Sequence, residues 1–100
     1  MQAVLDAISS PRRRQILRLV WDQERTAGDI ASRFDVSWPA VSQNLKLLRS
    51  AGLVTERREG TKRFYRAEPA ALGSLRVVLR EMWERDLDDL EVAMERERRG

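Results

Sequence analysis

The stretch SWPAVSQNLKLLRSAGLV, residues 37–54, decides the fold. Ser37 and Pro39 are typical of a helix start, because a serine oxygen caps free amides and proline fits the first helical turn. Gly52 suits the left-handed position that follows a helix C-terminus. Between these signals an apolar stripe with helical spacing faces a core, and it consists of Val41, Leu45 and Leu48. The sequence therefore predicts a helix that opens at Ser37 or Trp38 and ends just before Gly52.

The opposite face of this helix carries cations and amides but no carboxylate. Its residues are Trp38, Ser42, Gln43, Asn44, Lys46 and Arg49. Surface helices usually mix both charge signs, so this face suggests a polyanionic partner. The alternative is an ordinary solvated face that lacks acidic residues by chance, and the stretch alone does not separate the two.

The distribution of charge along the chain favours the polyanion. The chain has 100 residues and a formal net charge of +3. Residues 1–66 contain 13 Lys and Arg against 7 Asp and Glu, whereas residues 67–100 contain 6 against 9. A basic front and an acidic tail fit a nucleic-acid surface joined to a surface of another kind. The length is that of one domain.

The composition argues against several classes of function. The chain has no Cys and no His, so disulfides, thiol chemistry and the commonest general base and metal ligand are absent. It also has no glycine-rich phosphate loop. No apolar run approaches the roughly 18 residues of a membrane helix, and the N-terminus lacks a signal-peptide pattern. We therefore expect a cytoplasmic protein that is not an enzyme and holds no metal or cofactor.

Three shorter helices are expected before residue 37. The first covers residues 2–8, with Val4, Leu5 and Ile8 on one side. The second follows Ser10 as N-cap, and its inward stripe is Ile16, Leu17, Val20 and Trp21. The third begins at Thr26 and ends near Asp35. Its tight junction with the next helix outlines a helix-turn-helix.

After Gly52 the hydrophobic period changes from 3.6 to 2. The segments LVTERRE (53–59) and KRFYRA (62–67) flank Gly60-Thr61, which predicts a β-hairpin. Basic residues cluster around its turn: Arg57, Arg58, Lys62, Arg63 and Arg66. Next to a helix-turn-helix, such a hairpin is typical of a wing that touches the DNA backbone. The alternative is a ribbon whose arginines only keep its edge soluble.

From Pro69 to about Glu97 the pattern is helical again. A helix of about 25 residues spans about 38 Å, whereas a compact domain of this size has a radius of gyration of about 13 Å. So long an apolar stripe predicts self-association, with residues 2–8 contributing. A helix folded back on its own domain is the alternative for its first half. The expected dimer interface is Val4, Leu5, Ile8, Leu72, Leu75, Leu79, Met82, Trp83, Leu87, Leu90 and Met94.

Three segments together resemble the arsenical-resistance repressor (ArsR/SmtB) family of bacterial winged-helix regulators. They are SPRRRQIL (10–17), DIASRFDVSWPAVSQNLKLLRSAGLV (29–54) and REGTKRFYR (58–66). The resemblance implies a mainly α fold with a β-hairpin, in the order α-α-α-α-β-β-α, as a single winged helix-turn-helix domain over residues 1–100. It also implies a homodimer through the terminal helices, with the dimerisation helix at about 69–97. The second helix of the helix-turn-helix then enters the DNA major groove.

The chain departs from the family pattern at informative positions. Trp38 stands where glutamine is common and Asn44 where histidine is common, so the base preference is expected to differ. The family's Cys-x-Cys-Asp metal site is replaced by Thr26, Gly28 and Asp29. The family's other metal site needs histidines that this chain lacks. Metal sensing is therefore not implied, and no residue indicates an inducer.

The resulting prediction is a dimeric, sequence-specific DNA-binding repressor that acts on a palindromic operator of its own operon. A winged-helix protein-interaction subunit without DNA binding is the alternative. Ser42, Gln43 and Asn44 are expected to reach base edges. Trp38 is assigned either to a thymine methyl or to the domain's own core. The full set of expected DNA contacts is Arg13, Ser37, Trp38, Ser42, Gln43, Asn44, Lys46, Arg49, Arg57, Arg58, Lys62 and Arg63.

Overall fold

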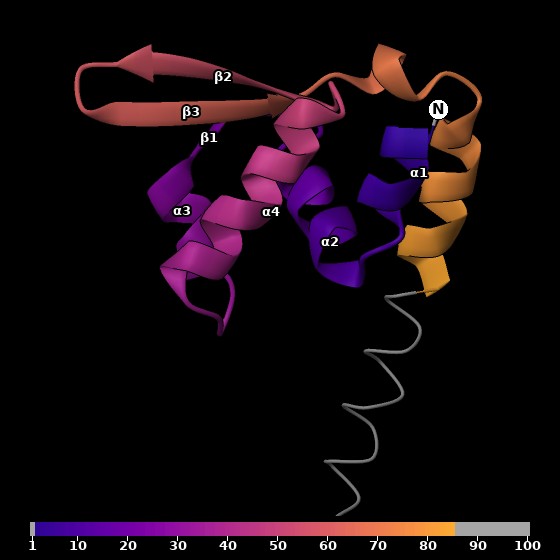
Figure 1. Ribbon diagram of the computed structural model, residues 1–100, viewed down its shortest axis with the longest axis horizontal. Coiled ribbons are helices and arrows are strands. Elements are labelled where there is room, and N and C mark those ends of the chain that lie inside the picture. Colours follow the sequence, from indigo (N-terminus) through magenta and orange to yellow (C-terminus); the bar gives the residue numbers. More distant parts are fainter. Residues whose placement is uncertain (1, 86–100) are drawn as a thin grey trace, which may run out of the picture.

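The computed structural model describes residues 2–85 of the chain (Figure 1). The elements in chain order are α1 (Gln2–Ile8), α2 (Pro11–Leu19), β1 (Arg25–Thr26), α3 (Ala27–Ser32), α4 (Trp38–Ser50), β2 (Val54–Glu59), β3 (Lys62–Ala67) and the 3₁₀ turn η1 (Pro69–Leu72). Residues 75–85 are helical. The order agrees with the predicted one, with one added strand before α3.

The sheet has three antiparallel strands in the order β1-β3-β2. The predicted hairpin is confirmed: β2 pairs with β3 from Val54↔Ala67 to Glu59↔Lys62, and Gly60 takes a φ of 62° in the turn. Strand β1 was not predicted, because two residues carry no period-2 signal. It pairs with β3 and so attaches the start of α3 to the wing.

The helix starts follow the predicted capping residues. The Ser10, Thr26 and Ser37 side chains accept hydrogen bonds from backbone amides of Arg13, Asp29 and Ala40, at 3.4, 3.0 and 3.4 Å. Each of these bonds satisfies an amide that the first helical turn leaves without a partner. Helix α3 ends at Ser32, earlier than the expected end near Asp35.

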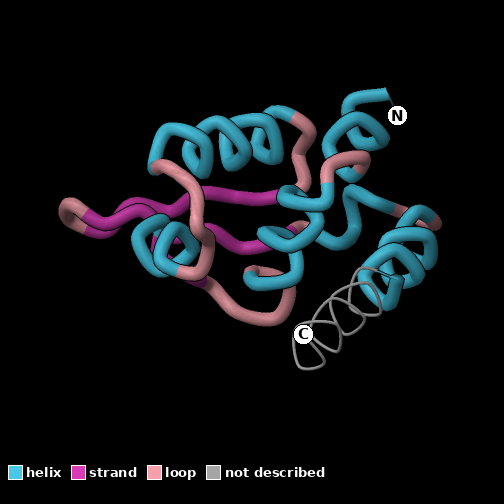
Figure 2. The backbone as a smooth tube through the Cα atoms, turned by 90° about the horizontal axis from the view of Figure 1, so that it is seen from below, coloured by secondary structure: helices cyan, strands magenta, loops and turns pink. Residues whose placement is uncertain are grey.

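The predicted inward stripes form the core. Buried residues from α2, α3, α4 and the base of the hairpin pack together, and they include Ile16, Leu17, Val20, Ile30, Val41, Leu45, Leu48, Leu53, Val54, Tyr65 and Ala67. Figures 1 and 2 show the hairpin turn projecting beyond this body at the end where α3 and α4 lie. Helix α1 and residues 75–85 lie at the opposite end in both views.

The expected continuous helix from Pro69 is interrupted. Residues Pro69–Leu72 form a 3₁₀ turn, and Gly73 follows with a φ of 54° and a ψ of −130°. A backbone in this region leaves the helical path, and glycine adopts it without steric cost. The α-helix begins only at residue 75, and the expected continuation over residues 86–97 lies outside the described residues.

Part of the expected dimer interface is core of the same chain. Ile8, Leu72, Leu79 and Trp83 are 2%, 4%, 0% and 9% exposed, so they offer a partner almost no free surface. The Trp83 indole Nε1 donates to the Arg14 carbonyl oxygen at 2.8 Å, which fastens the last described helix to α2. For Leu79 and Trp83 this burial favours the alternative, in which the first half of the terminal helix folds back on its own domain.

The rest of the expected interface is more open. Leu5 is 41% exposed. Val78 is not part of the expected interface but lies in the same helical segment as Leu75 and Met82, and it is 39% exposed. Val4, Leu75 and Met82 are half-buried. Leu87, Leu90 and Met94 lie outside the described residues.

Replacing Leu79 tests this burial. Leu79→Ala is expected to lower the free energy of unfolding by about 2–5 kcal/mol, because it empties a core position. Val77→Ala, on the same helix at a 64% exposed position, is expected to change it by less than about 0.5 kcal/mol. Urea denaturation at two protein concentrations measures both. A Leu79→Ala protein that unfolds like the unmodified chain, yet dissociates more readily, would contradict the burial of Leu79 within the protomer.

Candidate nucleic-acid interface

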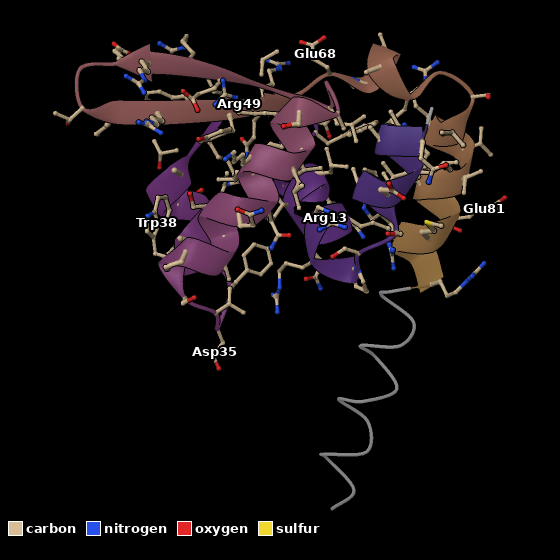
Figure 3. The ribbon with its side chains drawn as sticks, viewed as in Figure 1. Arg13, Asp35, Trp38, Arg49, Glu68 and Glu81 are labelled. Carbon is tan, nitrogen blue, oxygen red and sulfur yellow. The ribbon has the colours of Figure 1, made fainter. Side chains whose placement is uncertain are left out.

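The outer face of α4 is exposed. Its buried stripe turns Ser42, Gln43 and Lys46 outward, and all three side chains are exposed. Trp38, in the first turn of α4, is 52% exposed (Figure 3), so it does not serve as a cover of the core. This face contains a hydroxyl, an amide, a cation and an aromatic ring, all accessible to a partner.

A groove of about 440 Å³ separates α4 from the hairpin. We call it the α4–wing groove, and its lining residues are Thr26, Ala27, Gly28, Trp38, Ser42, Leu45, Thr61, Lys62, Arg63 and Tyr65. These residues come from the start of α3, from α4 and from the wing. None of the described lining residues is acidic, so the groove attracts anions.

Asn44 has a different environment from its neighbours on α4. It is half-buried; its Oδ1 accepts a hydrogen bond from Arg13 Nη1 at 3.2 Å, and its Nδ2 donates to the Ala40 carbonyl oxygen at 3.0 Å. Both ends of the amide are therefore engaged inside the protein. These two hydrogen bonds compete with the role of base reader that the sequence predicts for Asn44.

Arg13 is also engaged within the protein. Its Nε donates to the Ala7 carbonyl oxygen at 2.7 Å and its Nη2 to the Asp6 carbonyl oxygen at 2.9 Å (Figure 3). These carbonyls belong to the last turn of α1, where the end of a helix favours a cation. The Asp6 carbonyl oxygen also accepts from the Ser9 backbone amide at 3.4 Å and from the Ser9 hydroxyl at 2.7 Å. Arg13 therefore links α1 to α4 through Asn44, whereas the sequence assigned it to a phosphate.

Arg57 on the wing is held by two carboxylates. Its guanidinium donates to Glu24 at 2.6 and 3.1 Å and to Glu59 at 2.9 Å, and it lies 4.5 Å from the centre of the Phe64 ring. The hydrogen bonds that Arg57 donates to Glu24 and then to Glu59 raise the pKa of Arg57, and the hydrogen bond from Arg57 lowers the pKa of Glu24. Arg57 is thus a poor match for the expected phosphate contact, because its charge is already compensated.

Glu56 gathers the other arginines between α4 and the wing. Its side chain is 9% exposed; it accepts from the Tyr65 hydroxyl at 2.9 Å and pairs with Arg49 at 3.0 Å and Arg58 at 3.6 Å. Burial alone raises the pKa of Glu56, but the Tyr65 hydrogen bond and the charges of Arg49, Arg63 and Arg58 lower it overall. Glu56 therefore stays ionised and connects the C-terminal part of α4 to the hairpin.

The lysines differ from these arginines. Lys46 and Lys62 are both exposed, and neither forms an ion pair with another residue in the range 2–85. Sequence reasoning found these two cations but missed the counterions Glu24 and Glu56. The Glu24–Arg57 pair joins residues 33 positions apart, and no local signal marks such a contact.

Within the described part of the chain, no group of three Asp, Glu, Cys or His residues is arranged to hold a metal ion. No helix among residues 2–85 is long and apolar enough to cross a membrane.

The chain is similar to known bacterial regulatory proteins. Residues 10–56 match the family described as bacterial regulatory protein, arsR family. The chain is 40% identical over 81 residues to the HTH-type transcriptional regulator Rv2034 of Mycobacterium tuberculosis, covering 81% of this chain and 76% of that protein. It is 42% identical over 65 residues to the transcriptional repressor SdpR of Bacillus subtilis, covering 65% of this chain and 72% of that protein.

A solved structure shares the fold. It is described as a possible transcriptional regulator for arsenical resistance, with a TM-score of 0.68, 37% sequence identity, and coverage of 89% of this chain and 93% of that one. The winged helix-turn-helix prediction is thereby confirmed. The family and these relatives are transcriptional regulators and not enzymes, as the composition suggested. The chain therefore belongs to the ArsR family of bacterial transcriptional regulators.

Proposed function

We propose that this regulator is a dimeric repressor that binds a palindromic operator of its own operon in the bacterial cytoplasm. The observation that carries the proposal is the exposed, acid-free face of α4 beside a projecting hairpin with an unpaired cation. A helix of this kind fits the major groove, and a hairpin at its side reaches the adjacent backbone.

Base reading falls to the exposed side chains of α4. The Gln43 amide pairs bidentately with adenine N6 and N7, and the Ser42 hydroxyl accepts or donates to either base of a pair. The accessible ring of Trp38 packs against a thymine methyl group. Asn44 acts indirectly, because its contact with Arg13 sets the position of α4 on the domain.

Backbone contacts come chiefly from cations that no carboxylate neutralises. Lys46 on α4 and Lys62 at the wing meet this condition. The Ser37 hydroxyl at the start of α4 adds a neutral phosphate contact of the kind that positions a helix on DNA. The paired arginines contribute less, because carboxylates partly neutralise their charge. Arg49 and Arg58 pair with Glu56, and Arg57 pairs with Glu24 and Glu59.

Dimerisation uses the end of the molecule away from the hairpin. Leu5 of α1 and Val78 expose apolar surface there, and the half-buried Leu75 and Met82 extend it. Burying this surface against a second copy removes apolar area from water. A two-fold dimer presents two α4 helices, which matches a palindrome with two half-sites.

The decisive experiment is a salt titration of DNA binding with the upstream region of the regulator's own gene and a scrambled duplex. We expect tighter binding to the upstream region and an affinity for both duplexes that falls steeply with salt. A protein-interaction subunit without DNA binding, the other candidate, would bind neither duplex measurably.

Gln43 and Asn44 are expected to respond differently to truncation. Gln43→Ala should cost about 1–3 kcal/mol on the operator and little on scrambled DNA, because it removes a base contact. Asn44→Ala should weaken binding to both duplexes by similar factors, because it frees α4 from Arg13. Gln15→Ala, an exposed amide on α2, is the matched control. Loss confined to the operator in Asn44→Ala would instead identify Asn44 as a base reader.

Lys62 and Arg57 provide a second contrast, within the wing. Lys62→Ala should weaken both duplexes and reduce the salt slope by about one, because it removes a phosphate contact. Arg57→Gln should change the slope much less, since Glu24 already compensates that charge. Titrations of both variants over the same salt range make the comparison, and equal slopes in the two variants would rule out this division of the wing cations.

The dimer is tested by a charge at its exposed apolar surface. Val78→Glu should dissociate the protein, because a carboxylate buried in an apolar interface has no partner. Val77→Glu, one position away and outside the apolar stripe, is the control and should remain dimeric. Light scattering at micromolar concentration reports the mass of each protein. A monomer for the unmodified chain under these conditions would exclude the proposed dimer.

A further inference from the structure

The α4–wing groove has features of a small-molecule site. We infer that it binds a small planar aromatic carboxylate, and that this ligand competes with DNA. The inference that a ligand binds depends on the groove alone, whereas the inference that the ligand competes with DNA rests on the proposed function. Such a ligand would act as an inducer.

The size of the groove suits a ligand. Its volume of about 440 Å³ lies within the range of about 300–1,000 Å³ that is common for ligand sites. Gly28, in α3, lines it, and a Cβ atom added there would have no other atom within 4 Å. The space beside α3 is therefore open, and nothing in the described fold fills it.

The lining explains the preference for an aromatic ring. Leu45 and Tyr65 are 2% and 5% exposed, so they form an apolar floor at the bottom of the groove. Trp38 adds a large, accessible ring at the side. A flat apolar ligand covers these surfaces and stacks against the indole in an offset or edge-on geometry. A DNA phosphate alone would leave this apolar surface in contact with water.

The rim explains the preference for a carboxylate. Lys62 and Arg63 supply two positive charges at the edge of the groove, and no described lining residue is acidic. The Arg63 charge is partly offset by Glu56, which lies outside the lining. Lys62 has no ion pair within residues 2–85, so its ammonium is available to an incoming anion. The Ser42 and Thr61 hydroxyls lie on the same lining and can donate hydrogen bonds to carboxylate oxygens.

The position of the groove explains the competition. Ser42, Trp38 and Lys62 line it and are also proposed DNA contacts. A ligand that occupies these side chains removes them from DNA, so ligand and operator exclude one another. Because the coupling between two binding sites is reciprocal, operator DNA must lower the affinity for the ligand by the same factor.

Naphthoate is the probe, and isothermal titration calorimetry on the DNA-free, full-length protein measures its binding. Naphthylmethanol, which keeps the rings but lacks the charge, and cyclohexanecarboxylate, which keeps the charge but lacks the aromatic ring, are the matched ligands. We expect saturable binding of naphthoate and weaker binding of both others. Naphthoate should also quench tryptophan fluorescence, and Trp38→Phe should remove that quenching although Trp21 and Trp83 remain. Equal binding of all three ligands, or no saturable binding of naphthoate, overturns the inference.

Variants locate the ligand. Gly28→Leu places a side chain in the open space and should weaken naphthoate binding by about tenfold or more. Gly28→Ala, at the same helical position with a smaller side chain, is the control and should bind nearly as well. Lys62→Ala should weaken binding by about two- to fivefold, the range for a partly exposed ion pair. Undiminished binding in Gly28→Leu would mean that the ligand occupies another site and would overturn the inference.

Operator binding without ligand is measured in parallel for every variant. If naphthoate binds but the protein has no affinity for DNA, the groove assignment stands and the proposed function fails. If the protein binds the operator but not naphthoate, the groove serves only DNA binding and the ligand inference fails. If the protein binds both naphthoate and the operator, naphthoate is expected to lower the operator affinity of the unmodified protein and of Gly28→Ala but not that of Gly28→Leu.

Discussion

Val41, Leu45 and Leu48 of α4 are almost completely buried against the rest of the core, and the other surfaces of the molecule follow from that packing. A helix has a single rotational setting that buries these positions together. In that setting Ser42, Gln43 and Lys46 face outward. The same packing leaves Trp38 beside the wing, where it lines the α4–wing groove. One buried stripe thus determines both the surface proposed for DNA and the groove proposed for a ligand.

Ion pairs within the protein reduce the number of wing arginines that can bind DNA phosphates. Glu24 and Glu56 each compensate arginines that the composition alone would assign to DNA. Such pairs hold the hairpin against the body, and they also reduce the number of charges available to phosphates. Cations outside the described ion pairs, among them Lys46 and Lys62, therefore contribute more to the proposed DNA contacts.

The Arg13 guanidinium connects the two ends of the molecule. It caps the last turn of α1 and holds the Asn44 side chain of α4. Helix α1 lies at the end proposed for dimerisation, and α4 carries the surface proposed to read DNA. Arg13 therefore joins these two surfaces through its hydrogen bonds.

Local signals in the sequence determined the helix starts at Ser10, Thr26 and Ser37, the inward stripes of α2 and α4, and the hairpin with its glycine turn. These features depend on residues within a few positions of each other, so their patterns are visible along the chain. Strand β1 was too short to have a pattern, and the break at Gly73 interrupts an apolar stripe that continues on both sides of it.

Tertiary structure alone decided which polar groups are engaged and which are free. The Arg13–Asn44 and Arg57–Glu24 contacts join residues 31 and 33 positions apart. Likewise, Leu79 and Trp83 had the spacing of an exposed interface stripe, yet they complete the core of their own chain. Periodicity tells which side chains share a face, but the element that covers that face is set by the packing of distant segments.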